Sequence, residues 1–570
     1  MGIGQLVSGL TVRQGAPWAV VGEAAINLAP PPVKNFAISA FGSNDKNVLV
    51  AGILVVLAIF AAVVGVLALR RLAYGYLGLA IFAAVGVAAA ISLPKANLGW
   101  AAPTVFGALV AAFFLTKLTQ RALDATATAV AIPPPAAPER PGAQAPDTEA
   151  DPEADPAADT GDAPAGTVSP ASASAWTRSS TQDPAGEVDD GWTPRDPAPA
   201  GPPPETWTYR LPDRTARRRF LVASGLAVGT TAVAAFAGRE LNARQSVTQA
   251  RSTVRLPKPA DPAPPLPAGV NLNIPNLSSY VTSNSSFYRV DTAIVLPQVD
   301  PASWQLRIHG MVEREISISF AQLLRRPLIE HYVTLTCVSD PVAGPYIGNA
   351  KWLGASLADL IRSARPRAGA TQLLCTSVDG FTSGTPIEVV LDGREALLAV
   401  AMNGTALPVE HGFPARMVVP GLYGYVSATK WVTDIKVTTY QAEVAYWTQR
   451  GWSAQAPIKT ESRIDVPLGG ASVKRGRTAI AGVAWAQHRG IDAVEVRVDS
   501  GPWQQATLAA VPGVDTWRQW AYYWDAPPGN HVIEARATDK TGNTQTANQA
   551  PPEPNGASGY PSIQVTVKSS

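Results

Sequence analysis

Cysteine and histidine are scarce in this chain of 570 residues, which has two cysteines and five histidines. Two cysteines are too few for a disulfide scaffold, a zinc ribbon or an iron–sulfur cluster with four cysteine ligands. The chain has no Cys-x-x-Cys-His sequence, which excludes covalent haem, and no His-Glu-x-x-His sequence that would indicate a zinc hydrolase. The formal net charge of +2 is close to neutral, so nothing predicts nucleic acid as a partner.

Long apolar runs are present near the N-terminus, at residues 48–69, 73–93 and 100–118. Each is long enough to cross a hydrocarbon core of about 30 Å. Basic residues close the first and third runs: Arg70, Arg71, Lys117 and Arg121. Because basic residues favour cytoplasmic ends, we expect three transmembrane helices over residues 47–121, with residues 1–46 on the extracytoplasmic side.

Residues 122–215 have a different composition, dominated by Ala, Pro, Asp, Glu, Ser, Thr and Gly. Such a segment has too few apolar side chains to offset the loss of chain entropy on folding. We therefore expect a disordered, acidic, Pro-rich cytoplasmic linker.

A basic cluster, Arg-Arg-Arg-Phe-Leu at residues 217–221, opens the next apolar run. It resembles a twin-arginine export signal placed inside the chain, although any basic cluster before a helix also acts as a positive-inside anchor. The twin-arginine route exports folded proteins, as a protein loaded with a cytoplasmic cofactor requires. We expect residues 216–239 to be this signal and a fourth transmembrane helix, with everything after it extracytoplasmic.

The remaining chain divides into three parts by composition and periodicity. Residues 240–269 are polar and Pro-rich and predict a stalk. Residues 270–455 alternate short strand patterns with helical ones and predict an α+β domain. Alternating strands separated by Gly, Pro and Asp turns predict an immunoglobulin-like β-sandwich over residues 456–570.

Cys337 is the most informative single residue, because it ends a β-rich run and is followed by Ile-Gly-Asn-Ala-Lys-Trp at residues 347–352. A thiolate is a strong ligand for soft metals, which suggests a metal site. A buried structural cysteine is the alternative. Cys375, the other cysteine, lies in an apolar run and is predicted to belong to the core.

Other segments accompany Cys337 in a fixed order: Tyr288-Arg289, Thr376-Ser377, His411 with Arg416, and Ser427-Ala428-Thr429-Lys430. With Cys337, this order resembles the sulfite oxidase family of molybdenum enzymes, and the resemblance covers about residues 274–567. It implies a molybdopterin domain of the sulfite oxidase type followed by the β-sandwich through which the family dimerises. Membrane-anchored bacterial members of the family are the implied relatives.

The resemblance also implies the cofactor, molybdenum–molybdopterin (Mo-MPT), and the residues that hold it. Cys337 is the implied metal ligand and catalytic residue. The implied cofactor-binding residues are Tyr288, Arg289, Thr376, Ser377, His411, Arg416, Ser427, Ala428, Thr429 and Lys430. Arginine suits this role because its planar fork bonds phosphate bidentately, and a loop with backbone N–H groups and a lysine is typical of phosphate sites.

The chain also departs from the sulfite oxidases at three places. Residues 290–292 are Val-Asp-Thr where the eukaryotic enzymes carry Arg-Asn-His. Val-Ser-Asp follows Cys337 where they carry Ala-Gly-Asn-Arg-Arg, so Asp340 brings negative charge close to the metal site. Phe381 lies where their catalytic tyrosine is expected. A carboxylate near the metal should repel sulfite.

We therefore expect a multi-pass membrane protein whose extracytoplasmic molybdopterin domain transfers an oxygen atom to or from a small-molecule substrate. A separate electron carrier is needed because no haem sequence is present. A homodimer through the C-terminal domain is implied by the resemblance. Two alternatives remain: a sulfite dehydrogenase of the same family, and a cofactor-free binding module, which the β-sandwich and the membrane anchor would suit.

Overall fold

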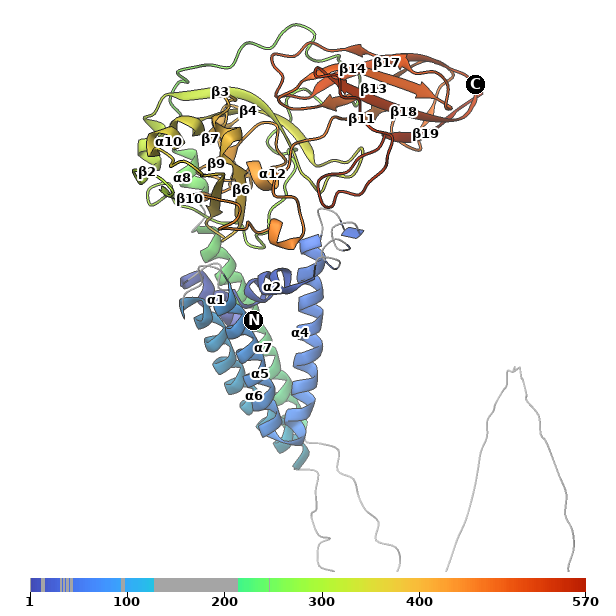
Figure 1. Cartoon of the computed structure of the whole chain (residues 1–570). Helices are drawn as coiled ribbons and strands as arrows, with labels where there is room; N and C mark the ends of the chain where they lie inside the picture. The colour runs from blue at the N-terminus through green and yellow to red at the C-terminus, as the bar shows by residue number, and fades with distance from the viewer. Residues whose placement is uncertain are drawn as a thin grey trace, which may run out of the picture. The chain divides into compact units, whose positions relative to one another are not determined.

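The computed structural model (Figure 1) describes residues 2–11, 16–30, 33, 36, 40–41, 45–93, 98–127, 214–244 and 247–569. The chain forms two units, of which one comprises residues 1–123 and 215–570 and the other residues 124–214. The linker predicted at residues 122–215 lies almost wholly outside the described residues. Every strand that the structure describes belongs to the first unit.

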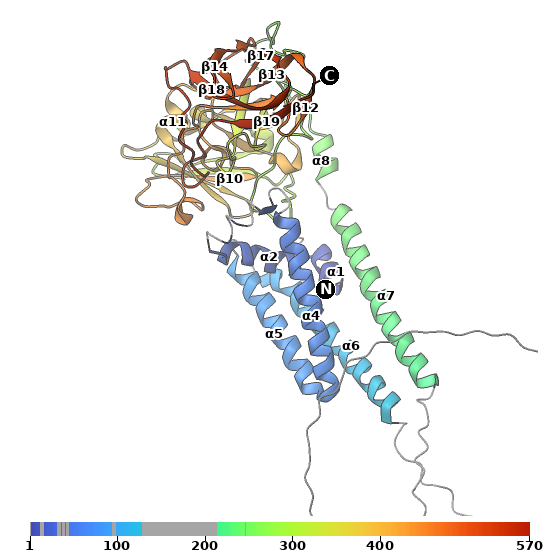
Figure 2. The same ribbon diagram turned by 90° about the vertical axis from the view of Figure 1, so that its right-hand side faces the viewer.

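Four helices are long and apolar enough to cross a membrane: α4 (Asp45–Arg70), α5 (Leu72–Ser92), α6 (Ala102–Ala127) and α7 (Arg214–Arg244). Two shorter helices precede them, α1 (Gly2–Leu10) and α2 (Pro17–Leu28). Small residues allow close approach in this bundle. A Cβ added at Gly78 of α5 would lie 2.5 Å from the side chain of Val64 on α4. The helices predicted over residues 47–121 and 216–239 are thus found at the expected places (Figure 2).

The predicted stalk differs from the structure over most of its length. Helix α8 (Thr248–Ser252) lies against the following domain, where Arg251 donates from Nε to the carbonyl oxygen of Leu407 at 2.7 Å. Leu256 packs against the domain core, and Asp261 forms an isolated β-bridge with Ile329. Residues 247–269 are therefore part of the folded domain, because their apolar side chains find partners there.

Two sheets build the domain over residues 270–455. One has the order β2-β1-β10-β5-β6, and the other has the order β3-β4-β7-β8 with β9 paired to β7. Their strands are β1 (Gln305–Gly310), β2 (Ile316–Ser319), β3 (Leu328–Thr336), β4 (Ile347–Ser356), β5 (Gln372–Ser377), β6 (Thr382–Pro386), β7 (Leu397–Met402), β8 (Thr405–Ala406), β9 (Arg416–Val418) and β10 (Val432–Thr438).

Short helices connect these strands: α9 (Phe320–Leu324), α10 (Leu357–Ala364), α11 (Ile387–Leu391), η4 (Val409–His411) and α12 (Gly424–Ser427). Two further 3₁₀ turns lie elsewhere, η3 (Leu98–Ala101) before α6 and η5 (Thr448–Arg450) after β10. The start of α10 follows from the sequence. The Ser356 hydroxyl accepts the backbone N–H of Asp359 at 3.1 Å, which satisfies one of the unpaired donors at the helix start.

Two further sheets form the C-terminal domain, in the orders β11-β13-β17-β16 and β12-β19-β18-β14-β15. Their strands are β11 (Glu461–Val466), β12 (Ser472–Val473), β13 (Gly476–Trp485), β14 (Ile491–Val498), β15 (Gln504–Gln505), β16 (Thr507–Leu508), β17 (Arg518–Ala526), β18 (Gly529–Asp539) and β19 (Ser562–Val567). Ile480 and Trp520 of the first sheet and Val494 and Ile533 of the second share one core, as in a β-sandwich.

Candidate active site

A cavity of about 710 Å³ lies at the ends of several strands of the domain over residues 270–455. Seven of the eleven residues that the sequence predicts for the site line it: Tyr288, Arg289, Cys337, Ser377, Arg416, Ala428 and Lys430. They come from sequence segments as much as 142 residues apart, so the fold of the two sheets brings them together.

Cys337 is positioned by the antiparallel pair β3 and β4. It follows the last residue of β3, and its backbone N–H donates to the carbonyl oxygen of Tyr346 at 2.9 Å. Burial raises the pKa of the Cys337 thiol to about 11. A bound cation removes this obstacle because metal coordination deprotonates a thiol outright. The position therefore suits a metal ligand better than a free nucleophile.

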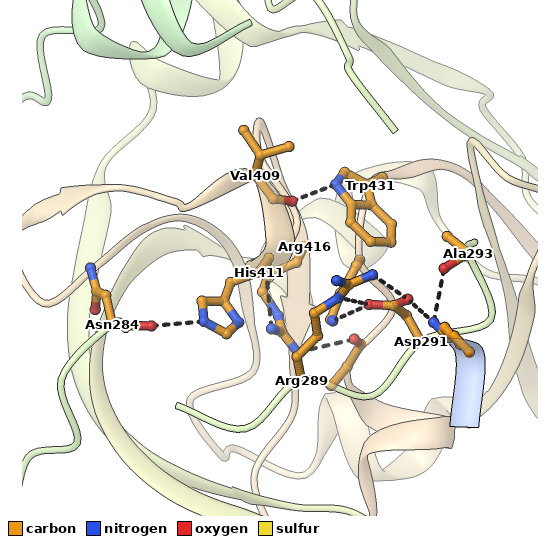
Figure 3. Close-up of polar contacts among 11 residues, drawn as sticks. Asn284, Arg289, Asp291, Ala293, Val409, His411, Arg416 and Trp431 are labelled. Atoms are coloured by element: carbon orange, nitrogen blue, oxygen red, sulfur yellow. Dashed lines mark hydrogen bonds and ion pairs between the residues drawn. The ribbon is translucent and has the colours of Figure 1, made fainter. Parts of the chain in front are cut away.

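A buried carboxylate, Asp291, lies among three cations in the wall of this cavity (Figure 3). Its carboxylate oxygens accept hydrogen bonds from Nζ of Lys430 at 2.9 Å, Nε of Arg289 at 2.8 Å and Nζ of Lys46 at 2.6 Å. Burial alone would raise the pKa of Asp291, but Lys430, Lys46 and Arg289 together hold it well below its usual range. Burial lowers the pKa of Lys430 to about 8 although Asp291 opposes this shift.

Arg416 and His411 lie next to each other, as the spacing in the sequence predicts (Figure 3). Arg416 is 4% exposed and donates from Nη1 to the carbonyl oxygen of His411 at 3.2 Å. Its guanidinium carbon lies 5.1 Å from the ring centre of Trp352. Burial lowers the pKa of Arg416 to about 10. The side chain is thus a buried cation whose hydrogen bonds go to backbone carbonyl oxygens and whose guanidinium lies near an aromatic ring.

The His411 ring donates from one nitrogen and leaves the other as an acceptor. Burial, followed by the proximity of Lys430 and Arg416, lowers its pKa to about 4, so the ring is neutral near pH 7. Nε2 lies 3.0 Å from the carbonyl oxygen of Asn284 and must donate to it. Nδ1 is then the acceptor, and it is buried without a hydrogen-bond partner among the described residues. An unpaired buried acceptor of this kind suits a donor group on a ligand.

Thr376, Ser427 and Thr429 do not line the cavity, and neither does His411. The Ser427 hydroxyl donates to the carbonyl oxygen of Leu422 at 2.9 Å, and the Thr429 hydroxyl lies 2.5 Å from that of Ser383. These hydroxyls hold the loop in place within the protein. Among residues 427–430, Ala428 and Lys430 reach the cavity wall, and Gly424, Tyr425 and Trp431 on either side line it as well.

Sequence reasoning missed several residues of the cavity wall. The sequence marks Asp291 only as a departure from the sulfite oxidases, and it does not indicate that Asp291 is the counter-charge of Lys430. Helix α2, residue 33 and the first turn of α4 also contribute: Ala25, Ile26, Ala29, Val33, Lys46, Asn47 and Leu49. No local signal could have identified them, because they are more than 230 residues from the rest of the site.

The side chains of this cavity fit a phosphate-bearing, metal-containing cofactor. A thiol faces a cavity whose wall also carries the buried cations Arg416 and Lys430. Only one carboxylate, Asp291, is hydrogen-bonded to Lys430 among the described residues, and no carboxylate is bonded to Arg416. Buried positive charge without a full counter-charge is unfavourable unless an anion binds there.

The domain that contains this cavity is similar to known proteins. Residues 293–447 match the family described as oxidoreductase molybdopterin binding domain. The uncharacterized oxidoreductase YuiH of Bacillus subtilis is 30% identical over 168 residues, which cover 30% of this chain and 81% of that protein. This chain belongs to the sulfite oxidase family of molybdopterin oxidoreductases. The predicted family, enzyme class and molybdenum–molybdopterin cofactor are thereby confirmed, and a cofactor-free binding module is not supported.

Other members of the sulfite oxidase family match a larger part of the chain. Sulfite oxidase of Gallus gallus is 29% identical over 321 residues, which cover 48% of this chain and 69% of that protein. The mitochondrial sulfite oxidase of Rattus norvegicus is 28% identical over 322 residues, and the match spans 58% of its length. Among solved structures, the sulfane dehydrogenase SoxCD of Paracoccus pantotrophus matches 48% of this chain and 76% of its own at 23% identity, with a TM-score of 0.41.

Proposed function

We propose that this chain is a membrane-anchored, extracytoplasmic molybdopterin oxidoreductase that performs oxygen-atom transfer at a molybdenum ion ligated by Cys337. The observation that carries the proposal is the placement of the Cys337 thiol on the wall of the cavity that also presents Arg416 and Lys430. When bound, the cofactor supplies the metal at which an oxygen atom is exchanged. The protein supplies a soft ligand on one side and buried positive charge on the other.

The chain's own residues would hold the cofactor by charge and by hydrogen bonds. Arg416 and Lys430 would bind its phosphate, since both are buried cations on the cavity wall. Arg289 is 37% exposed and would close the site from the solvent side. His411 does not line the cavity and would act through its carbonyl oxygen, which accepts a hydrogen bond from Nη1 of Arg416. Tyr288 and Ser377 complete the wall and keep water away from the metal.

The anchor would consist of the four long apolar helices. They are 18 to 25 residues long within their apolar limits, enough to cross a bilayer. Basic residues after α4 and at the start of α7 favour a cytoplasmic location for those ends, which places residues 240–570 outside. The twin-arginine-like motif supports export of a folded, cofactor-loaded domain. We also propose that the C-terminal sandwich forms the dimer contact.

The substrate would be an uncharged oxygen-atom donor or acceptor. Asp340 follows Cys337 closely and is 4% exposed, with Oδ1 accepting the backbone N–H of Tyr346 at 2.8 Å. Its Oδ2 has no hydrogen-bond partner among the described residues. Burial raises the pKa of Asp340 to about 7, so an anion bound nearby would either be repelled by the carboxylate or force it to take up a proton, and both lower the binding affinity. A dianion such as sulfite would therefore bind poorly.

Sulfite oxidation is the second candidate, because several similar proteins are sulfite oxidases. It would require the cations Arg289, Lys430 or Arg416 to serve the substrate in addition to the cofactor. Sulfite-dependent reduction of ferricyanide by the full chain would favour this candidate over an uncharged substrate.

The first test is the molybdenum and pterin content of the full chain, expressed with its own export signal. We expect about one molybdenum and one pterin per chain, and reduction of an uncharged sulfoxide or N-oxide by a reduced viologen dye. Absence of both molybdenum and pterin, from a host that makes the cofactor, would contradict the proposal.

A further inference from the structure

The cavity of the candidate active site extends to the first turn of a membrane helix. Lys46 and Leu49, which line it, lie in helix α4, whose most apolar 18-residue window has a mean hydropathy of 3.0. Ile26 of helix α2 and Ala29, directly after that helix, line the same cavity as Cys337. One space thus connects the predicted metal ligand with the end of a helix suited to a bilayer.

The outer wall of the cavity is the part formed by α2 and the start of α4. Three contacts hold this outer wall against the molybdopterin domain. Lys46 donates from Nζ to Oδ1 of Asp291 at 2.6 Å and to the carbonyl oxygen of Ala293 at 2.8 Å (Figure 3). The Tyr446 hydroxyl donates to Oδ1 of Asn27 at 3.0 Å.

The third contact is made by Gly22 of α2. A Cβ added there would lie 2.6 Å from Cδ1 of Ile294 in the molybdopterin domain and 3.5 Å from Cδ1 of Ile53 on α4. Helix α2 is therefore packed between the domain and the membrane helix, and glycine allows this close approach.

The outer part of the cavity is mostly apolar and aromatic. Its side chains are those of Ile26, Val33, Leu49, Phe381, Trp447 and Trp452. Trp447 and Trp452 contact each other edge to face, with ring centres 6.1 Å apart. Asp379 adds one carboxyl group to the wall, and burial raises its pKa above the ordinary value. Such a lining accepts a flat ring that carries hydroxyl groups.

We propose that this outer chamber, lined by α2, the start of α4, Trp447 and Trp452, binds a lipid-soluble two-electron carrier of the quinol class. The inference rests on the proposed function, because oxygen-atom transfer needs a two-electron partner. A quinol QH₂ and an uncharged oxide R=O would give Q, R and water. The two O–H bonds of the quinol and the bond between R and oxygen break. The two electrons would reach the oxide at the cofactor that Cys337, Arg416 and Lys430 would hold, and both protons would leave in the water.

An electron carrier that diffuses in the bilayer is consistent with the small number of metal-binding residues in the chain. Two cysteines and no Cys-x-x-Cys-His sequence leave no four-cysteine iron–sulfur cluster or covalent haem to relay electrons from elsewhere. A quinol reaches the first turn of α4 by diffusion in the membrane, without such a relay. Lys46 is the positioning residue in this scheme, because its bond to Asp291 fixes the outer wall against the cofactor site.

The test is photolabelling of the full chain in phospholipid nanodiscs with an azido-substituted quinone, followed by mass spectrometry. We expect label on residues 22–30 or 445–453, removed by an excess of decylubiquinol.

Ile26→Trp, which fills the chamber, should lower this label at least five-fold. Val56→Trp is the matched control, since Val56 lies on α4 and is 64% exposed, and it should label like the natural chain. Equal labelling in Ile26→Trp, or label only on outward faces of the spans, would overturn the inference.

Lys46 is tested in the same assay. Lys46→Ala should lower the specific label, and Lys46→Arg should restore most of it because a guanidinium also pairs with Asp291. Lys351→Ala is the control, because it removes a lysine whose ion pair, with Glu330 at 2.8 Å, is not part of this wall. It should leave the specific label unchanged.

Two further readouts on the same samples separate this inference from the proposed function. Molybdenum content and dye-driven reduction of the oxide report on the function, and photolabelling reports on the chamber. Dye-driven activity without competed label overturns the quinol site alone. Competed label without molybdenum or dye-driven activity overturns the proposed function alone.

Discussion

The carboxylate of Asp291 lies 2.9 Å from the ammonium group of Lys430, and the two side chains are only 6% and 9% exposed. A buried ion pair is costly to break, because loss of one partner leaves the other charge without compensation. The pair also sits where a cofactor phosphate is proposed to bind. The stability of this region should therefore depend on the counter-charges available to Lys430.

Replacement of Asp291 tests this dependence. We expect Asp291→Asn to lower the free energy of unfolding of the cofactor-free protein by about 3 kcal/mol, since it leaves Lys430 buried and unpaired. The loss should be smaller in the loaded protein, where the phosphate supplies negative charge. Urea unfolding of both forms measures the difference. Asp359→Asn, in an exposed pair with Arg362, should cost under about 1 kcal/mol. Equal losses in the loaded and cofactor-free forms would contradict a phosphate near Lys430.

Cys337 and Cys375 form a second comparison, because both are buried thiols but only Cys337 lines the cavity. Cys337→Ser should lower oxide reduction more than the roughly 100-fold typical for loss of an outer-shell partner, and should change the electron paramagnetic resonance of the metal. Cys375→Ala should leave that spectrum unchanged and cost about 1 kcal/mol of stability, as deletion of a small buried group does. An unchanged spectrum in Cys337→Ser would exclude it as the ligand.

Glu461 gives a prediction for the pH dependence of stability. Burial, followed by the proximity of Asp340, raises its pKa to about 8, above the ordinary 4.5. The folded state then holds a proton that the unfolded state has lost, so stability should fall as pH rises from about 5 to 8. Glu461→Gln should flatten this slope in thermal unfolding between these pH values. Glu313→Gln, at an exposed position, should keep the slope. A parallel slope in Glu461→Gln would show that other groups cause it.

Arg463 connects the C-terminal domain to the loop after Cys337. It donates from Nη1 to the carbonyl oxygen of Gly344 at 2.9 Å and from Nη2 to the hydroxyl of Ser278 at 2.9 Å. Arg463→Ala should cost about 2–4 kcal/mol, because hydrogen bonds to a charged group contribute about 1.5–3 kcal/mol each. It should also broaden the metal spectrum by loosening the loop. Arg362→Ala, on the exposed face of α10, is the control for loss of an arginine.

The sequence predicted most of the elements because their signals are local. The alternating strand and helix patterns over residues 270–455 correspond to β1–β10 with α9–α12, and the alternating strands over residues 456–570 correspond to β11–β19. The apolar helices were found because their length and composition are sufficient signals. The stalk was placed incorrectly, since polar and Pro-rich sequence does not reveal that Leu256 has a partner in the domain core.

The candidate site was predicted residue by residue through short motifs, and the structure placed seven of these residues on one cavity. The hydroxyls of Ser427 and Thr429 differ from the expectation, because their direction depends on Leu422 and Ser383. A motif specifies which groups are available. Only packing specifies which of them face the cavity and which hold the backbone.

The sequence by itself determined the family, the cofactor class, the apolar helices and the thiol at Cys337, because each depends on short segments and on their order along the chain. The tertiary structure alone decided that Asp291 is shared by Lys430, Arg289 and Lys46, and that α2 and α4 wall the cavity of Cys337. Lys46 and Asp291 are 245 residues apart, and no local pattern carries the information that two such charges meet. Their contact results from the packing of whole elements. This packing buries the carboxylate of Asp291, and a buried carboxylate needs cations close to it.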